Sequence, residues 1–119
     1  MKNTLVIGAS TNPERYAHRA ITQLRAKNHS VIAFGLKPGT VTDVTIETEW
    51  NPVWQVDTVT LYLNAQRQEA FYDQIVALHP RRVIFNPGTE NPIFEALLTK
   101  AGIETEEACT LVLLSLGEY

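Results

Sequence analysis

Short apolar runs alternate with helix-like segments along most of the chain. Runs rich in β-branched and aromatic residues predict four strands, at residues 4–7, 30–34, 57–63 and 82–85. The first run is apolar throughout, which is typical of a strand buried on both faces. A shorter run at residues 103–105 predicts a fifth strand. Val41, Val44 and Ile46 fit either a short strand or an irregular crossover, so the pattern does not decide the secondary structure of residues 40–56.

The first helix is predicted between the first two strands. Asn12 is a plausible N-cap with proline at the following position, although a start one turn later also fits. Asn28 can adopt the left-handed conformation that ends a helix. Apolar residues at helical spacing form one inward stripe, which consists of Ala17, Ala20, Ile21 and Leu24.

Two further helices follow the third and fourth strands. Asn64 is expected to cap the second helix, in which Phe71, Ile75 and Leu78 share a face. Asn91 as cap, proline at the next position and Gly102 past the end bracket the third. Its inward residues are predicted to be Ile93, Leu97 and Leu98. The pattern of the apolar tail, residues 111–116, does not decide between helix and strand.

The regular alternation of strands and helices predicts an α/β fold. Its strands should be parallel and its crossovers right-handed. We expect a three-layer, doubly wound, mostly parallel Rossmann-like sheet of about five strands, built as a single domain over residues 1–119. Ligands of such sheets bind beyond the carboxyl ends of the strands, where the strand order reverses. The candidate loops are therefore residues 8–15, 35–39, 63–65 and 86–91.

Composition narrows the functional classes. The length of 119 residues suits one domain. The single cysteine, Cys109, excludes an intrachain disulfide and a cysteine-rich zinc site. A net charge of −3 speaks against binding nucleic acid through bulk charge. No apolar run approaches the roughly 18 residues that span a membrane, and the first residues lack a signal-peptide layout. We therefore expect a cytoplasmic protein without nucleic-acid or membrane partners.

The charge is unevenly distributed along the chain. Residues 1–37 hold six basic residues and one acidic residue, which gives +5, whereas residues 38–119 hold four basic and twelve acidic residues, which gives −8. Such an asymmetry indicates a positive feature that an anionic ligand could use. A solvated helix face accounts for three of these charges, and Arg15 and Lys37 remain to be explained.

The loop after the first strand has residue types that suit a phosphate. Gly8 allows a sharp turn, and free backbone N–H groups at the helix start can hold an anion. Ser10 and Thr11 add hydroxyl donors, and Arg15 can bind a phosphate in a bidentate manner. Neither the three-glycine dinucleotide fingerprint nor a Walker-type sequence is present. An ordinary strand-to-helix turn fits these residues equally well.

The loops after the second and fourth strands add two further observations. A classical NAD site needs a carboxylate after the second strand, and residues 34–38 contain none. Lys37 suits instead a phosphorylated ribose, either the 3′-phosphate of coenzyme A or the 2′-phosphate of NADP. After the fourth strand, Pro87 and Gly88 form a rigid turn at which a ligand could approach the backbone closely.

No catalytic constellation is visible in the sequence. The three histidines are far apart and lack metal-ligand spacing. Ser10 has no nucleophile-elbow context. Three glutamates precede Cys109 within five residues, and their charge would raise the pKa of the thiol, so a small buried residue is the expected role. We predict neither catalytic nor metal-binding residues.

Three segments together resemble a known family. The sequence Gly8-Ala9-Ser10-x-x-Pro13-x-Arg15, the proline after the second strand and the segment 107–112, read as Glu-Ala-Cys-Thr-Leu-Val, are similar to the small bacterial CoA-binding proteins. These are Rossmann-like domains related to the CoA-binding domain of the succinyl-CoA synthetase alpha subunit. The resemblance covers essentially the whole chain. It includes no phosphohistidine or nucleotide-grasp segment, so it implies binding without ligase activity.

The resemblance also implies roles for individual residues. Gly8, Ala9 and Ser10 would lie against the CoA phosphates, Arg15 would reach a phosphate, and Lys37 with Pro38 would lie beside the adenosine. Gly88 would line the path of the pantetheine arm. Combined with the loop analysis, the expected cofactor-binding residues are Gly8, Ala9, Ser10, Thr11, Asn12, Arg15, Lys37, Pro38, Asn64, Pro87 and Gly88.

The leading hypothesis is a non-catalytic module that binds coenzyme A or an acyl-CoA. One alternative is an NADP-dependent reductase-like domain, for which Tyr62 is the one proton donor that can be placed. Another is a protein-interaction module that has lost its nucleotide. The apolar segment 111–116 is a candidate surface for a homodimer or another protein partner.

Overall fold

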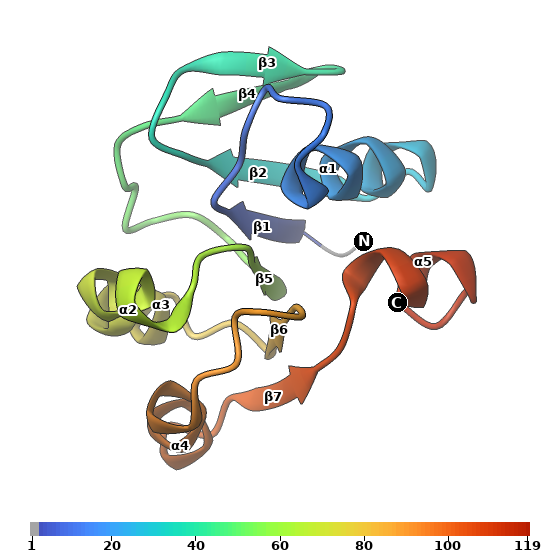
Figure 1. The fold of residues 1–119 in the computed structure, drawn as a ribbon. Coiled ribbons are helices and arrows are strands. Elements are labelled where there is room, and N and C mark those ends of the chain that lie inside the picture. The colour runs from blue at the N-terminus through green and yellow to red at the C-terminus, as the bar shows by residue number, and fades with distance from the viewer. Residues whose placement is uncertain (1–2) are drawn as a thin grey trace.

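A seven-stranded sheet forms the middle layer of the computed structural model, which describes residues 3–119 (Figure 1). Its strands lie in the order β3-β4-β2-β1-β5-β6-β7. All neighbouring pairs are parallel except β3 and β4. The strands are β1 (Asn3–Ile7), β2 (Ser30–Phe34), β3 (Gly39–Val41), β4 (Val44–Glu47), β5 (Thr58–Leu61), β6 (Arg82–Phe85) and β7 (Glu104–Glu107). The predicted mostly parallel α/β fold is thus confirmed.

The number of strands was predicted incorrectly, as seven are present instead of about five. The difference arises in the segment whose secondary structure the sequence pattern did not decide. There, residues 39–47 form the antiparallel hairpin β3–β4. Thr42 takes a positive φ of 53° and turns the chain between the two strands. Asp43 in the same turn accepts two hydrogen bonds from Arg25 on the first helix, at 2.9 and 2.8 Å. This long-range contact holds a hairpin whose strands are too short for a clear sequence pattern.

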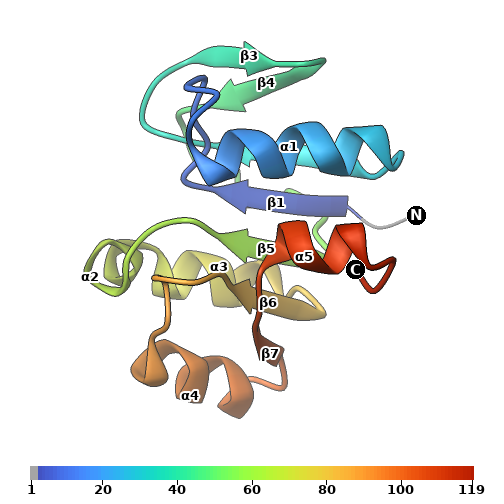
Figure 2. The same cartoon turned by 45° about the vertical axis from the view of Figure 1, so that its right-hand side comes forward.

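Helices cover both faces of the sheet, as Figures 1 and 2 show. One face carries α1 and α5, and the other carries α2, α3 and α4. Alternate residues of β1 enter the two cores, with Leu5 and Ile7 on the side of α4 and Val6 on the side of α1. The helical segments are α1 (Tyr16–Ala26), α2 (Ala65–Gln68), the 3₁₀ turn η1 (Glu69–Phe71), α3 (Tyr72–Leu78), α4 (Pro92–Lys100) and α5 (Thr110–Ser115).

The first helix begins at Tyr16, one turn after the preferred sequence prediction. Side chains of the preceding loop hold that turn out of the helix. The Asn12 N–H donates to Ser10 Oγ at 3.1 Å, and the Glu14 N–H donates to Asn12 Oδ1 at 3.0 Å. The predicted end is confirmed, because Asn28 takes a left-handed φ of 64°.

The ends of α4 agree with the sequence prediction, but its inward face does not. Asn91 caps the helix by accepting the Phe94 N–H at 3.1 Å. Phe94 and Leu98 are buried, whereas Ile93 and Leu97 are 70% and 44% exposed. The helix is rotated by about one residue because the Phe94 ring stacks on Tyr72 of α3 at 4.3 Å. The predicted orientation of Ile93 and Leu97 was therefore wrong.

The structure decides two regions whose secondary structure or packing the sequence pattern left undecided. The apolar tail is helical and forms α5. Trp50 and Trp54 pack at the edge of the core, with ring centroids 5.2 and 6.2 Å from that of Phe34. None of the helices in residues 3–119 is long and apolar enough to cross a membrane.

Candidate functional site

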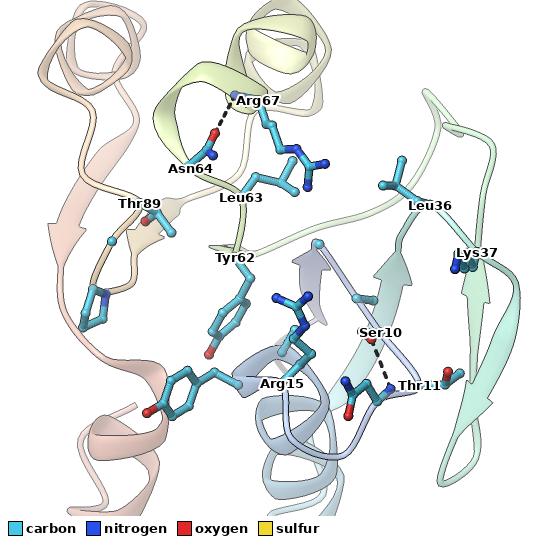
Figure 3. Close-up of a pocket in the computed structure, with 17 residues that line it drawn as sticks. Ser10, Thr11, Arg15, Leu36, Lys37, Tyr62, Leu63, Asn64, Arg67 and Thr89 are labelled. Carbon is cyan, nitrogen blue, oxygen red and sulfur yellow. Dashed lines mark hydrogen bonds between the residues drawn. The ribbon is translucent and has the colours of Figure 1, made fainter.

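A pocket of about 580 Å³ opens at the carboxyl ends of β1, β2, β5 and β6 (Figure 3). Its walls come from the loops that follow these four strands. The strand order reverses here, because β1 lies between β2 and β5. Ligands of doubly wound sheets bind at this position. The volume falls within the range of about 300–1,000 Å³ that is usual for small-molecule sites.

The structure brings nearly all predicted site residues together in this pocket. Of the predicted set, Pro38 alone does not line the pocket. It directly precedes β3, the first strand of the hairpin. The predicted residues that do are Gly8, Ala9, Ser10, Thr11, Asn12, Arg15, Lys37, Asn64, Pro87 and Gly88. The further lining residues are Tyr16, Ala17, Leu36, Tyr62, Leu63, Arg67 and Thr89.

The first loop presents unused backbone donors to the pocket. Gly8, at a φ of +94°, and Ala9 turn the chain, and their N–H groups donate to Phe34 O at 2.9 and 3.0 Å. The N–H groups of Ser10 and Thr11 make no hydrogen bond within the described chain. Ser10 Oγ accepts the Asn12 N–H and keeps its own O–H as a donor (Figure 3).

The adjoining start of α1 also lacks a side-chain cap for its backbone N–H groups. Arg15 occupies the N-cap position, and its side chain makes no capping hydrogen bond. The first turn contains no acidic residue. The other long helix, α4, has both an Asn91 cap and Glu95 in its first turn. Free N–H groups and the positive end of the helix dipole favour an anion at such a start.

Three cations surround the opening and have no counter-charge there. Arg15 comes from the first loop, Lys37 from the loop after β2 and Arg67 from α2 (Figure 3). The lining residues, all within 3–119, include no aspartate or glutamate. None of the three cations forms an ion pair within the part of the chain that the structure describes. The pocket is therefore positive in a protein whose net charge is −3.

The far wall of the pocket is held by internal hydrogen bonds. Asn64 Oδ1 accepts the Arg67 N–H at 2.9 Å and so caps α2, as predicted. Gly88, at a φ of +90°, has no atom within 4 Å of a Cβ position, so its surface is open. Its N–H, however, already donates to Glu90 Oε1 at 2.9 Å. Gly88 therefore offers a ligand an open backbone surface, but its N–H is already bonded to Glu90 and is not a free donor.

Tyr62 contributes its ring to the pocket, while its hydroxyl is buried beneath it. The hydroxyl makes no hydrogen bond of good geometry within residues 3–119. Burial raises the pKa of Tyr62 to about 12, an effect that the nearby Thr110 and Thr60 hydroxyls offset only in part. These two hydroxyls already bond each other at 2.8 Å. The phenol is thus directed into the protein interior.

The close packing around Gly35 provides a test of the first loop. A Cβ at Gly35 would lie 2.4 Å from the Ala9 carbonyl oxygen, so a backbone segment must move in Gly35→Ala. We expect a loss of about 1–3 kcal/mol in the free energy of unfolding, typical of overpacking, together with weaker binding of anionic ligands. Urea unfolding and calorimetric titration measure the two effects.

Gly102→Ala is the control for this substitution. Gly102 has nothing within 4 Å of a Cβ position and a φ of +81°, so the variant should lose stability and retain its ligand affinity. Parental stability and affinity in Gly35→Ala would show that the first loop does not depend on this contact.

Arg67 is the charged lining residue that the sequence analysis missed. The charge asymmetry directed attention to residues 1–37, and Arg67 lies in the acidic remainder. A usable signal was its place three residues after the Asn64 cap, at the carboxyl end of a parallel strand. Leu36, at 80% exposure, was missed because an exposed leucine is unremarkable without the pocket beside it.

The other chemically reactive residues lie outside the pocket. Cys109 is a free, half-buried thiol, whereas a small buried residue was expected. His79 ends α3 with a left-handed φ of 49°, and the His29 ring packs against Tyr119 at 4.9 Å. Within residues 3–119, no three His, Cys, Asp or Glu side chains are grouped as metal ligands.

Comparisons with known proteins identify the family. The model of the CoA binding domain family matches residues 2–115. A crystal structure described as that of an uncharacterized protein is 47% identical, covers 100% of this chain and 98% of its own, and superposes with a TM-score of 0.96.

Two more distant structures share the fold. A protein from Thermus thermophilus is 22% identical over 99% of this chain and 90% of its own, with a TM-score of 0.85. A hypothetical protein from Pyrococcus horikoshii OT3 is 19% identical over 93% and 80%, with a TM-score of 0.84. No curated protein matches the chain. The family match spans nearly the whole chain, and the protein belongs to the CoA binding domain family.

Proposed function

We propose that this protein binds coenzyme A or an acyl-CoA in the pocket above β1, as a single binding module without a catalytic step. The observation that carries the proposal is the set of three cations around the opening of the pocket. Within residues 3–119, none of them forms an ion pair and no acidic residue lines the pocket. Coenzyme A carries three phosphate groups, whose negative charge is opposite in sign to that of these cations. Membership of the family supports the same ligand.

The first loop and the start of α1 suit the diphosphate. The free N–H groups of Ser10 and Thr11, the Ser10 hydroxyl and the uncapped helix start are all hydrogen-bond donors on one side of the pocket. Arg15 adds a guanidinium beside them. Donors of this kind bind phosphate more strongly than neutral groups bind one another, because the acceptor is ionised.

The loop after β2 suits the adenosine end. Lys37 supplies the charge for a ribose phosphate, and the exposed side chain of Leu36 offers an apolar surface for a flat base. No carboxylate is present in residues 34–38 to bind a free ribose 2′-hydroxyl, as NAD would require. The pantetheine arm would then extend along the neutral wall formed by Asn64 and Gly88.

A reductase function is less well supported by the position of Tyr62. A proton donor must lie within hydrogen-bond reach of the reacting group. The Tyr62 hydroxyl is buried under the pocket floor, and its pKa is raised to about 12. We therefore propose binding in preference to NADP-dependent catalysis.

Native mass spectrometry of the protein, purified without denaturation, tests the proposal. A co-purifying mass that fits coenzyme A or one of its thioesters is the expected result, and its acyl group would be read directly. For protein that comes without a ligand, a thermal shift with added CoA is expected. No shift with CoA or any nucleotide would contradict the proposal and favour the interaction-module alternative.

The order of ligand affinities tests the assignment of Lys37. We expect CoA to bind more tightly than dephospho-CoA, and both to bind more tightly than NAD. One exposed ammonium–phosphate contact contributes on the order of 1 kcal/mol and less at high salt, so the preference should be a few-fold and should shrink as salt rises. Calorimetric titration of these three ligands and of NADP at two salt concentrations measures it. Tightest binding of NAD would contradict the assignment, and NADP ahead of CoA would favour the reductase-like alternative.

A further inference from the structure

Arg67 directs a guanidinium without a counterion into the pocket from the side opposite the first loop. Figure 3 shows its side chain extending from α2 past Leu63, toward the space that Arg15 enters from the start of α1. The other arginines in the second half of the chain are paired. Arg81 lies 3.1 Å from Asp57, and Arg82 lies 3.3 Å from a carboxylate of β7. Arg67 has no such partner within residues 3–119.

The backbone at Arg67 is held in place from both sides. Its N–H donates to Asn64 Oδ1 at 2.9 Å. The next residue, Gln68, is fully buried, and its Nε2 donates to two backbone carbonyls, including Thr89 O at 2.7 Å. Gln68 Oε1 accepts from Asn91 Nδ2 at 3.0 Å. These bonds join the loops after β5 and β6, so the turn that carries Arg67 is fixed relative to the pocket before any ligand arrives.

Two guanidinium groups that face one opening without a carboxylate repel each other. An anion between them removes that repulsion and gives each group a bidentate acceptor. Lys37 lies at the adenosine side of the pocket and is already assigned to a ribose phosphate. The group that remains for the pair is the diphosphate, whose two phosphates offer oxygens in both directions.

We infer that Arg67 is a specificity-determining residue of this chain that binds the ligand diphosphate opposite Arg15. The inference rests on the proposed function, and it adds a contact from α2 to those of the first loop. The diphosphate is then held from two sides of the pocket. A ligand that lacks a diphosphate, such as pantetheine, gains nothing from Arg67.

Calorimetric titration of Arg67→Gln with CoA and with dephospho-CoA tests the assignment. Both ligands contain the diphosphate, and only CoA contains the ribose phosphate. Arg67→Gln should therefore weaken both by the same factor, about five- to tenfold for an exposed charge-assisted contact. Lys37→Gln should weaken CoA alone. Arg67→Lys, which keeps the charge without the planar fork, should lie between parent and Arg67→Gln.

Lys100→Gln is the matched control, because it removes one exposed positive charge at the far end of α4. It should bind both ligands as the parent does. Equal affinities of parent and Arg67→Gln, or a loss with CoA alone, would overturn the inference and leave the proposed function intact. A parent protein that binds neither ligand would overturn the proposed function itself. Thermal unfolding of each variant should match the parent, since the Arg67 side chain is exposed.

Discussion

Arg15→Glu is expected to weaken CoA binding by about 3 kcal/mol, or roughly a hundredfold. The substitution removes a charge-assisted hydrogen bond and places a carboxylate beside the ligand phosphates. Fold stability should hardly change, because Arg15 is exposed and its side chain makes no capping hydrogen bond. Calorimetric titration measures the affinity, and urea unfolding measures the stability.

Arg19→Glu is a matched control for this experiment. Arg19 lies one turn further along α1, is exposed, and does not line the pocket. The same change of charge there should alter CoA affinity only through long-range electrostatics, which added salt suppresses. If Arg15→Glu binds CoA as tightly as the parent, Arg15 is a surface residue and the phosphate site lies elsewhere.

Asn86→Ala is expected to lower the free energy of unfolding by about 3 kcal/mol. Asn86 is 2% exposed and joins three elements. Its Nδ2 donates to Thr60 Oγ1 at 2.6 Å and to Leu61 O at 2.9 Å, and its Oδ1 accepts the Thr110 N–H at 2.9 Å. Alanine would leave the Leu61 carbonyl and the Thr110 N–H buried without partners, which costs more than the bonds contribute.

A shift of the urea midpoint measures this loss. Asn51→Ala is the control, because Asn51 is exposed and its side chain accepts one hydrogen bond, from the Val53 N–H at 3.0 Å. That variant should lose less than about 1 kcal/mol. Equal midpoints for Asn86→Ala and Asn51→Ala would show that the Asn86 bonds are not structurally important.

Local patterns predicted the parts of the fold that depend on neighbouring residues. The strands at residues 30–34 and 82–85 have the predicted bounds. Asn91 with Pro92 marks the start of α4, and Asn28 adopts the left-handed conformation after α1. Caps, turns and apolar runs depend on residues close in sequence, so a single sequence displays them directly.

The hairpin β3–β4 and the rotation of α4 escaped prediction for a common reason. The hairpin is held by the bond from Arg25 to Asp43, eighteen residues away, and the inward face of α4 follows from the stacking of Phe94 on Tyr72. Neither partner can be recognised from the pattern of its own segment. Short elements are therefore decided by contacts between segments.

For the candidate site, too, some features could be predicted from the sequence and others depended on contacts between distant segments. The alternation of strands and helices placed the loops after parallel strands at one edge of a sheet, so the sequence sufficed to select Gly8, Arg15 and Lys37 as neighbours. The titrations of Arg15→Glu and Lys37→Gln test the predicted ligand contacts of the two cations. The pairing of charges was not visible in the sequence, because Arg67 and Arg81 are chemically identical there. Only folding brings a carboxylate to Arg81 and none to Arg67 within residues 3–119, since the distances between side chains are set by the sheet and its loops.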